Sequence, residues 1–334
     1  MLINKILIVG YGSIGKRHFR LVKEKFPLAD IRFFRHQRLN QRDVNDHLFI
    51  YDEGGLHKFS PQVAVIANPA PFHIEMAMVL VEMGVHLLIE KPLSNSIDGI
   101  EGLLKLAQKK NVFLMVGYNL RYLPSLNYFK DCIANQLIGP IMAIDVQCGQ
   151  YLPDWRPNND YRTGVTANKN LGGGVLLELS HEIDYVNWIF GEMTWVKAGL
   201  FKKSMLEVDV EDIACIIFGC KSTLSRTGEI CGTLHLDFIR QDSVRSCTAV
   251  GELGTIRWNG SKNSVELFSV TDGLWKVLYE ASIDRDESYR AEWENFINVV
   301  NFLETPKVTI LEGLYVLRVV EACKRASALG IEIV

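Results

Sequence analysis

The sequence predicts an α/β protein in which a doubly wound parallel sheet is followed by an α+β domain with a large, mainly antiparallel sheet. As far as about residue 118, short apolar runs such as "KILIVG" and "VAVIAN" alternate with amphipathic helical patterns, which is typical of buried parallel strands joined by crossover helices. Beyond that point, longer alternating runs such as "EICGTLHLDFIR" and "SCTAVGELGTIRW" indicate antiparallel strands with few helices between them.

The length of the chain fits two packed domains. It has 334 residues, of which 48% are hydrophobic and 22% are charged, and this composition is typical of globular proteins with ordinary cores. The change of pattern leads us to expect a first domain over residues 1–120 and a second over residues 121–334.

Composition and charge exclude several classes of function. The formal net charge is −3 and the lysines and arginines are scattered, so we expect no surface for nucleic acid. No apolar run approaches the roughly 20 residues of a membrane span, and the N-terminus enters a strand pattern without the layout of a signal peptide. We therefore expect a cytoplasmic protein that binds no membrane. The seven cysteines include no CxxC pair, which favours reduced thiols and no metal site.

The first candidate site is the glycine-rich segment "VGYGSIG" between the first strand pattern and the first helix pattern. In this GxGxxG motif Gly10 permits a tight turn, Gly12 lets the backbone approach a pyrophosphate, and Gly15 lets the helix pack closely on the strand. Ser13 and Ile14, at the start of the helix, would offer N–H groups to the phosphates. The motif predicts a dinucleotide-binding Rossmann domain, and the alternative is a purely structural turn.

The end of the second strand bears on the choice of cofactor. An acidic residue that binds the ribose hydroxyls of NAD(H) is expected there, but the chain has "IRFFRHQR". Arg35 and His36, with Arg38 nearby, place donors where the adenosine ribose is expected. We expect NADP(H) as the preferred cofactor and NAD(H) as the alternative, because a solvated basic strand end would explain the same residues.

A third segment, "LLIEKPLS", ends an apolar strand with Glu90, Lys91 and Pro92. A lysine at this edge of the sheet would lie beside the nicotinamide, and it could donate a hydrogen bond to a substrate oxygen. Pro92 can make the peptide bond before it cis. A surface lysine is the alternative interpretation.

Three segments together, "GYGSIG", "IEKP" and "GGGVLLELSHEID", resemble the glucose-fructose oxidoreductase, inositol dehydrogenase and MocA family, and the likeness covers nearly the whole chain. The resemblance implies hydride transfer at a carbinol or carbonyl carbon of a sugar-like substrate. It also implies a C-terminal sheet domain used for oligomerisation, hence a homodimer or homotetramer. The residues it places beside the nicotinamide are Asn68, His73, Glu90, Lys91 and Asn119.

The segment "GGGVLLELSHEID" predicts a helix that starts near Val175, with an apolar face toward the core. On its opposite face we expect Glu178, His181, Glu182 and Tyr185. His181 suits a general acid or base, because the unperturbed pKa of histidine is about 6.5. The family pattern has an acid four residues before this histidine, where the chain has Leu177. Glu178, three residues before, is either a catalytic substitute for it or a structural acid.

Substrate recognition is expected in the loop "GQYLPDWRPNNDYRTG". Aromatic faces stack on sugar rings, and arginine pairs with carboxylate or phosphate. The loop also resembles those of family members tied to surface-polysaccharide sugars, and this resemblance implies an acidic or nucleotide-linked sugar. The candidate substrate-binding residues are Tyr151, Trp155, Arg156, Arg162 and, from the following helix, Asp184. A lid or a dimer contact would suit the same loop residues.

The leading hypothesis is an NADP(H)-preferring oxidoreductase that acts on a sugar or sugar derivative. One alternative is a non-catalytic dinucleotide sensor that binds a partner protein. Another is a NAD-dependent polyol dehydrogenase of the inositol type.

Overall fold

The structure is a computed structural model that describes residues 2–35, 46–329 and 331–333. The chain forms two compact units. The first unit comprises Met1–Asn119 and Tyr289–Leu314, and the second comprises Leu120–Ser288 and Tyr315–Val334. Residues 289–314 therefore belong to the first unit, although they come from the C-terminal part of the chain.

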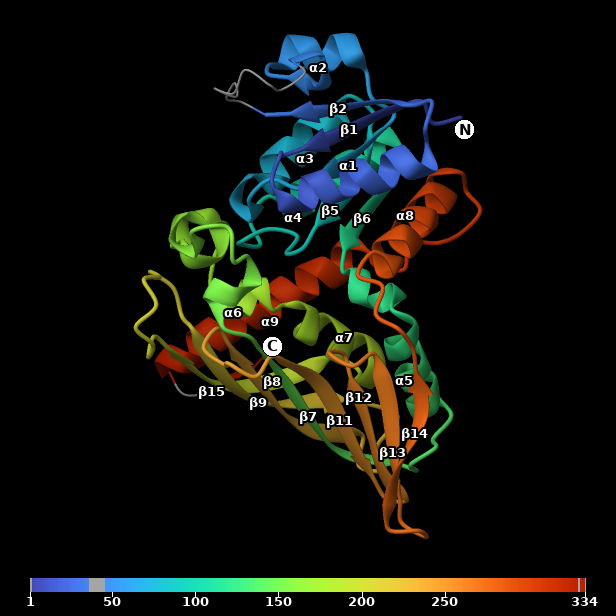
Figure 1. Cartoon of the computed structure of the whole chain (residues 1–334), viewed down its shortest axis with the longest axis vertical. Coiled ribbons are helices and arrows are strands. Elements are labelled where there is room, and N and C mark those ends of the chain that lie inside the picture. Colours follow the sequence, from blue (N-terminus) through green and yellow to red (C-terminus); the bar gives the residue numbers. More distant parts are fainter. Residues whose placement is uncertain (1, 36–45, 330, 334) are drawn as a thin grey trace. The chain divides into compact units, whose positions relative to one another are not determined.

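A six-stranded parallel sheet forms the centre of the first unit (Figure 1). The strand order is β3-β2-β1-β4-β5-β6, and every neighbouring pair is parallel. The strands are β1 (Lys5–Val9), β2 (Asp30–Phe34), β3 (Phe49–Ile50), β4 (Val63–Ile66), β5 (His86–Glu90) and β6 (Leu114–Gly117). Its helices within residues 1–119 are α1 (Ser13–Lys25), α2 (Glu53–Phe59), α3 (His73–Glu82) and α4 (Ile100–Lys110). The expected doubly wound sheet is confirmed.

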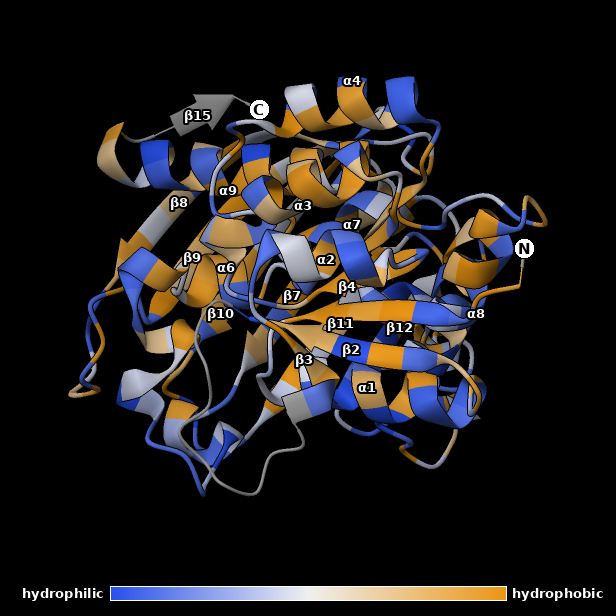
Figure 2. Cartoon of the chain, turned by 90° about the horizontal axis from the view of Figure 1, so that it is seen from above, coloured by the Kyte–Doolittle hydropathy of each residue, from blue (hydrophilic) through white to orange (hydrophobic). Residues whose placement is uncertain are grey.

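The helices of this sheet are amphipathic, as the sequence pattern predicted. Along α4 hydrophobic and hydrophilic stretches alternate (Figure 2). The buried residues of that helix are Ile100, Leu103 and Ala107, spaced so that they share one face.

Residues 289–314, from the C-terminal part of the chain, complete the first unit. It contains most of α8 (Glu287–Val300) and the start of α9 (Ile310–Leu329). The backbone N–H of Val116 in β6 donates to the carbonyl of Val308 at 3.2 Å. Gly313 packs so closely on β6 that a β-carbon there would lie 2.9 Å from the side chain of Val116. These contacts attach the C-terminal stretch to the end of the parallel sheet.

The second unit is built on a nine-stranded sheet in the order β14-β13-β12-β11-β7-β10-β9-β8-β15. The pair β7 and β10 is parallel and the remaining pairs are antiparallel, which confirms the mainly antiparallel sheet. The strands are β7 (Ile141–Gly149), β8 (Met193–Phe201), β9 (Ile213–Lys221), β10 (Glu229–Asp237), β11 (Val244–Gly251), β12 (Gly254–Asn259), β13 (Ser264–Ser269), β14 (Leu274–Glu280) and β15 (Ile331–Ile333).

Helices α5 (Pro124–Ala134), α6 (Val175–Glu178) and α7 (His181–Phe190) lie along one face of this sheet (Figure 1). Strand residues alternate between that face and the opposite one. Ile216 and Phe218 of β9 are buried, for example, whereas Cys215 and Ile217 are exposed. The short 3-10 helices of the chain are Asp46–Leu48, Ala70–Phe72, Asn119–Tyr122, Leu152–Trp155, Tyr161–Thr163, Val165–Ala167 and Lys169–Leu171.

All seven cysteines are free thiols, and five of them are buried. Among the described residues no helix is long and apolar enough to cross a membrane. No group of three histidine, cysteine or acidic side chains in the described part of the chain could hold a metal ion.

Candidate active site

The glycine-rich turn follows β1 in the first unit, and each of its three glycines has different surroundings. Gly10 has a φ of 101°, and a β-carbon there would lie 2.7 Å from the carbonyl oxygen of Ala67. A β-carbon at Gly15 would lie 2.2 Å from the carbonyl oxygen of Gly10. At Gly12, by contrast, a β-carbon would meet nothing within 4 Å. Two glycines therefore serve the packing of the turn, and the third leaves open space.

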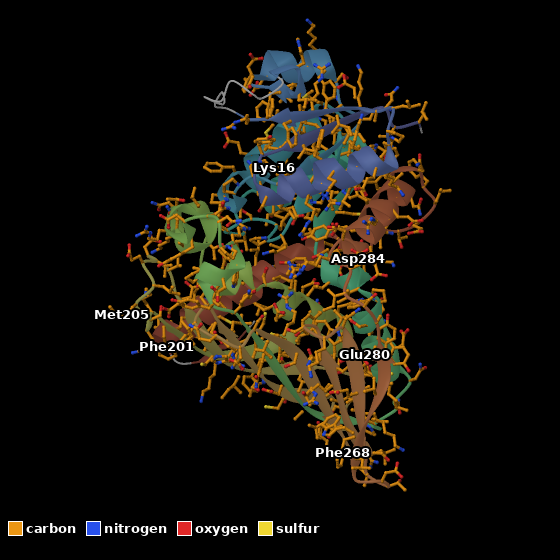
Figure 3. All side chains as sticks on the ribbon, in the orientation of Figure 1. Lys16, Phe201, Met205, Phe268, Glu280 and Asp284 are labelled. Carbon is orange, nitrogen blue, oxygen red and sulfur yellow. The ribbon has the colours of Figure 1, made fainter. Side chains whose placement is uncertain are left out.

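Helix α1 begins directly after Gly12 and presents its N-terminus at this open space. Its N-cap has no side chain that accepts a hydrogen bond, and its first turn, with Ser13 and Ile14, contains no acidic residue. The Lys16 side chain, labelled in Figure 3, lies with Nζ 4.4 Å from the centre of the Tyr11 ring. Backbone N–H groups, the positive end of the helix and a lysine together suit an anion such as a phosphate.

The end of β2 carries Arg35, whose side chain is half-buried and whose backbone N–H donates to the carbonyl of Ile50 at 3.1 Å. His36, the other predicted ribose-side residue, and the neighbouring Arg38 lie outside the described residues. The structure therefore describes one of the predicted cationic residues at this strand end.

Asn68 and His73 lie at the end of β4 and the start of α3. The Asn68 Oδ1 atom is buried and has no hydrogen-bond partner among the described residues, so it can accept a bond from a ligand. The His73 ring lies between two backbone carbonyls, with Nε2 2.7 Å from Asn68 O and Nδ1 3.1 Å from Pro92 O. Burial lowers the pKa of His73, although both carbonyls and the charge of Glu90 oppose this. The neutral ring can donate to only one carbonyl, and Nε2 makes the shorter contact.

Glu90 ends β5, and its carboxylate is held on both oxygens. His18 Nε2 lies 2.6 Å from Oε1, and the backbone N–H of Lys91 donates to Oε2 at 3.2 Å. The Lys91 side chain is half-buried, and the Lys91–Pro92 peptide bond is cis. Asn119, the last residue of the first unit's leading stretch, is buried.

In the second unit, the helix expected from about residue 175 is interrupted. Helix α6 ends at Glu178, Leu179 and Ser180 break the pattern, and α7 begins at His181. The expected polar face is wrong in part, because Glu182 and Tyr185 are fully buried. Glu182 Oε1 lies 2.8 Å from Arg245 Nε, as an ion pair whose angles do not meet those of a hydrogen bond.

Glu178 and His181 lie on opposite sides of this break. Glu178 is half-buried at the end of α6, and His181, 8% exposed, is the first residue of α7. The i, i+3 spacing of one continuous helix therefore does not describe how the two side chains are related. Their proposed chemistry is taken up below.

The three glycines before α6 have a structural explanation. A β-carbon at Gly173 would lie 2.4 Å from the carbonyl oxygen of Val165. Gly174 has a φ of 110°, and a β-carbon there would lie 2.5 Å from Oε1 of Glu211. Burial raises the pKa of Glu211. Gly173 and Gly174 thus allow the close approach of other segments of the chain.

Asp184, predicted to bind substrate, is instead the partner of a buried arginine. Arg121 donates from Nε to Oδ2 at 3.0 Å and from Nη2 to Oδ1 at 2.7 Å. The Asp184 carboxylate is buried with both oxygens engaged, so these contacts favour a structural role. Arg121 was not among the predicted site residues, although it lies in the segment "GYNLRYLP" and a buried arginine needs an acidic partner.

The predicted substrate loop contains residues that differ in how they are engaged. Trp155 donates from Nε1 to the carbonyl of Gln150 at 3.1 Å and packs edge-on against Phe238, while Tyr151 is half-buried. Arg162 pairs with Asp160 at 2.8 Å and with Glu207 at 3.3 Å. Arg156 is exposed. Arg162 is therefore partly neutralised by its neighbours, and Arg156 is the more available cation of the two.

Comparison with known proteins gives two matches to models of one family. Residues 4–118 match the model described as oxidoreductase family, NAD-binding Rossmann fold. Residues 130–331 match the model described as oxidoreductase family, C-terminal alpha/beta domain.

Several individual proteins are similar to the chain. Levoglucosan dehydrogenase of Pseudarthrobacter phenanthrenivorans is 29% identical over 162 residues, which cover 48% of this chain and 40% of that protein. D-glucoside 3-dehydrogenase of Escherichia coli (strain K12) is 22% identical over 355 aligned residues, which cover 98% of this chain and 96% of that protein. The match spans 37% of the length of an uncharacterized oxidoreductase of Synechocystis sp., 40% of the levoglucosan dehydrogenase and 61% of the uncharacterized oxidoreductase YrbE of Bacillus subtilis.

Among solved structures, the WlbA dehydrogenase from Bordetella pertussis, in complex with NADH and UDP-GlcNAcA, has the same fold. Its TM-score is 0.81 at 19% sequence identity, over 100% of this chain and 99% of that one.

Proposed function

Because the chain belongs to the glucose-fructose oxidoreductase, inositol dehydrogenase and MocA family of oxidoreductases, we propose that it transfers hydride between a nicotinamide dinucleotide and a carbinol or carbonyl carbon of a sugar or sugar derivative. The observation that carries the proposal is the glycine-rich turn after β1, where a β-carbon at Gly12 would meet no protein atom within 4 Å. A pyrophosphate needs this kind of backbone approach.

Other features of the first unit fit the same cofactor. The N-terminus of α1 lacks an acidic side chain that would compete with a phosphate. The orphaned Oδ1 of Asn68 lies after β4, at the carboxyl end of the parallel sheet, where dinucleotides bind in this fold. A carboxamide N–H is a suitable donor for it, and a bound nicotinamide carries one.

In the proposed reaction the nicotinamide supplies the hydride chemistry, while the protein supplies position, charge and proton transfer. Lys91 donates a hydrogen bond to the substrate oxygen and stabilises the negative charge that develops on it. His181 accepts the proton of the substrate hydroxyl in the oxidative direction and returns it in the reductive direction. Glu178, at the end of α6, is the candidate acid that assists His181.

Arg35 supports a preference for NADP(H) over NAD(H). It is the first residue after β2, where a residue that binds the ribose is expected, and its guanidinium suits a 2′-phosphate. The sequence has no acidic residue from Arg35 to Arg42 that could bind the 2′-hydroxyl of NAD(H).

The substrate class proposed is a sugar that carries an acidic or nucleotide group. Exposed Arg156 and half-buried Tyr151 and Trp155 belong to the loop that follows β7. An arginine pairs with carboxylate or phosphate, and aromatic faces pack on a sugar ring.

We also propose that the chain forms a homo-oligomer through the uncovered face of its large sheet. The exposed aliphatic side chains on strands of this sheet include Ile217 at 46%, Met142 at 52% and Val250 at 37%, which lie on β9, β7 and β11, inside the edges of the sheet. Ile217 pairs with Thr233 across β9 and β10, next to other outward-facing positions. A second copy of the chain would cover this apolar surface.

Titration of the protein with NADPH and with NADH, followed by nucleotide fluorescence, tests the proposed function. We expect tighter binding of NADPH, and the reverse preference in Arg35→Asp. Turnover of a panel of keto sugars, with and without carboxylate or nucleotide groups, should be lost in Lys91→Ala and His181→Ala. The proposal fails if neither cofactor binds the wild-type protein.

A further inference from the structure

Glu90, the residue before Lys91, is held by a buried chain of hydrogen bonds. Trp293 in α8 donates from Nε1 to His18 Nδ1 at 2.9 Å. His18 in α1 contacts Glu90 Oε1 through Nε2 at 2.6 Å, and Glu90 Oε2 accepts from the backbone N–H of Lys91 at 3.2 Å. His18 is fully buried and Trp293 is 1% exposed. Three segments of the first unit that are far apart in the sequence thus meet at one carboxylate.

The partners of His18 determine which ring nitrogen carries the proton. An indole N–H can only donate, so Nδ1 of His18 must be the acceptor and must lack a proton. The proton then lies on Nε2, which donates to Glu90. A second proton on Nδ1 would face the Trp293 N–H and break that bond. Trp293 therefore directs the Nε2 N–H of His18 at the carboxylate.

The residues around Glu90 leave room for its contact with His18. On the neighbouring strand β6, a β-carbon at Gly117 would lie 3.2 Å from Oε2 of Glu90, so any larger residue there would crowd the carboxylate. His18 lies three residues after Gly15 on the buried face of α1, together with Leu21 and Val22. A histidine on that face of the helix reaches the sheet at the end of β5.

A second acid lies in the same cluster and differs from Glu90. Glu292, next to Trp293 in α8, is fully buried, and its two carboxylate oxygens have no hydrogen-bond partner among the described residues. Burial and the charge of Glu90 raise the pKa of Glu292 well above its usual range. Burial therefore favours the neutral form of the Glu292 carboxyl group.

We propose that His18, oriented by Trp293, is a positioning residue that acts on Lys91 through the Glu90 carboxylate. This inference rests on the proposed role of Lys91 at the substrate oxygen. His18 is fully buried, and its effect is to fix the backbone from which the lysine side chain extends. Helix α8, which follows the second unit's strands in the sequence, becomes a supporting element of the catalytic strand end.

Substitution of His18 by glutamine or by asparagine distinguishes this positioning role from simple packing. In His18→Gln the side-chain amide N–H lies near the position of Nε2 and can still donate to Glu90. In His18→Asn the amide reaches only the position of Nδ1, so it keeps a partner for Trp293 and loses Glu90. If His18 served only packing, the two substitutions would have the same effect on Lys91.

The order of Lys91 can be measured without any substrate or cofactor. Reductive methylation of the protein with 13C-formaldehyde gives one NMR signal for each lysine, and the loss of a signal in Lys91→Arg assigns that of Lys91. We expect His18→Asn to move this signal toward those of exposed lysines and to narrow it, and His18→Gln to restore it. Ser125→Ala is the matched control, because it removes the acceptor of another buried indole, Trp258 Nε1 at 3.0 Å, in the second unit.

Kinetics with any sugar that proves to be a substrate provides a second readout. Misplacement of a catalytic group costs about 10- to 100-fold in rate, so we expect that loss of kcat in His18→Asn with little change in the KM for cofactor. If His18→Asn does not fold, as judged by circular dichroism, Glu90→Gln replaces it, because an amide nitrogen at Oε2 cannot accept from the Lys91 N–H.

An unchanged Lys91 signal in a folded His18→Asn protein would overturn the inference, and so would an equal change in His18→Gln. These results are independent of the proposed function. A wild-type protein that binds no nicotinamide cofactor contradicts the function, whereas the NMR comparison still decides whether His18 orders Lys91.

Discussion

Arg121 and Asp184 form a buried two-pronged ion pair within the second unit, with N–O distances of 3.0 and 2.7 Å. Each side chain is 1% exposed. The pair joins the entry of the second unit to helix α7, and the arginine also lies over the ring of Trp188, 5.5 Å from its centre. Because both carboxylate oxygens are engaged, loss of the Asp184 carboxylate should appear in the stability of the protein.

Asp184→Asn should therefore lower the free energy of unfolding by about 3–5 kcal/mol, because breaking a buried pair leaves an uncompensated charge on Arg121. Urea denaturation followed by tryptophan fluorescence measures this. The double variant Arg121→Met, Asp184→Leu removes both charges and should be less destabilised than Asp184→Asn. A single variant that unfolds at the wild-type urea concentration would refute the structural role.

Glu292 predicts a particular dependence of stability on pH. Since its pKa in the folded protein is raised by burial and by the charge of Glu90, its contribution to stability is fully present below the unfolded pKa of about 4.3. The contribution is lost as the pH rises toward the folded pKa, at about 1.4 kcal/mol per pH unit.

Glu292→Gln should remove this slope and raise the free energy of unfolding at neutral pH relative to the wild type. Denaturation curves between pH 5 and pH 8, at about one-unit steps, compare the two proteins. Glu294→Gln, at an exposed position two residues along the same helix, is the control and should keep the wild-type slope. Parallel slopes for wild type and Glu292→Gln would contradict the assignment of a neutral carboxyl group.

The glycine-rich turn predicts opposite outcomes for two of its glycines. Gly12→Val should leave the stability nearly unchanged, because a β-carbon there meets no protein atom within 4 Å, and should abolish binding of NADPH. Gly15→Ala should instead lower the free energy of unfolding by about 1–3 kcal/mol, because its β-carbon would press on the Gly10 carbonyl oxygen.

Thermal unfolding and NADPH titration of both variants test this pair. A Gly12→Val protein that still binds the cofactor as tightly as the wild type would exclude the turn as the pyrophosphate site.

The uncovered face of the large sheet predicts that assembly depends on Ile217. Ile217→Glu places a charge in the middle of β9, at an exposed aliphatic position, and should convert the homo-oligomer into a monomer. Light scattering coupled to size-exclusion chromatography measures the mass, and Leu274→Glu, exposed on edge strand β14, is the control. A wild-type protein that is itself a monomer would contradict the proposed interface.

Much of the fold could be predicted because it depends on local patterns. Runs such as "VAVIAN" became the fully buried strand β4, and the alternating "EICGTLHLDFIR" became β10 with one face buried. The positions of Gly10, Gly12 and Gly15 also follow from a local rule, since a turn, an open approach and a close packing contact are needed within six residues.

Sequence patterns did not predict the contacts that a side chain makes with a distant partner. Glu182 and Tyr185 were expected on a polar helix face, yet both are buried, because the Arg245 guanidinium of β11 lies against Glu182. Asp184 was expected to bind substrate, and its partner Arg121 lies 63 residues earlier in the chain. Helical periodicity specifies the angle of a residue on its own helix, and it carries no information about what packs against that face.

The sequence by itself therefore determined the two sheets, the glycine-rich turn and the presence of Lys91 at the end of β5, because strand period and turn chemistry act over a few neighbouring residues. Only the tertiary structure decided that most of α8, which follows the strands of the second unit in the sequence, belongs to the first unit and brings Trp293 to His18. That contact joins residues 275 positions apart. It exists because the buried indole and imidazole of these segments satisfy each other's hydrogen bonds only when the chain has folded back.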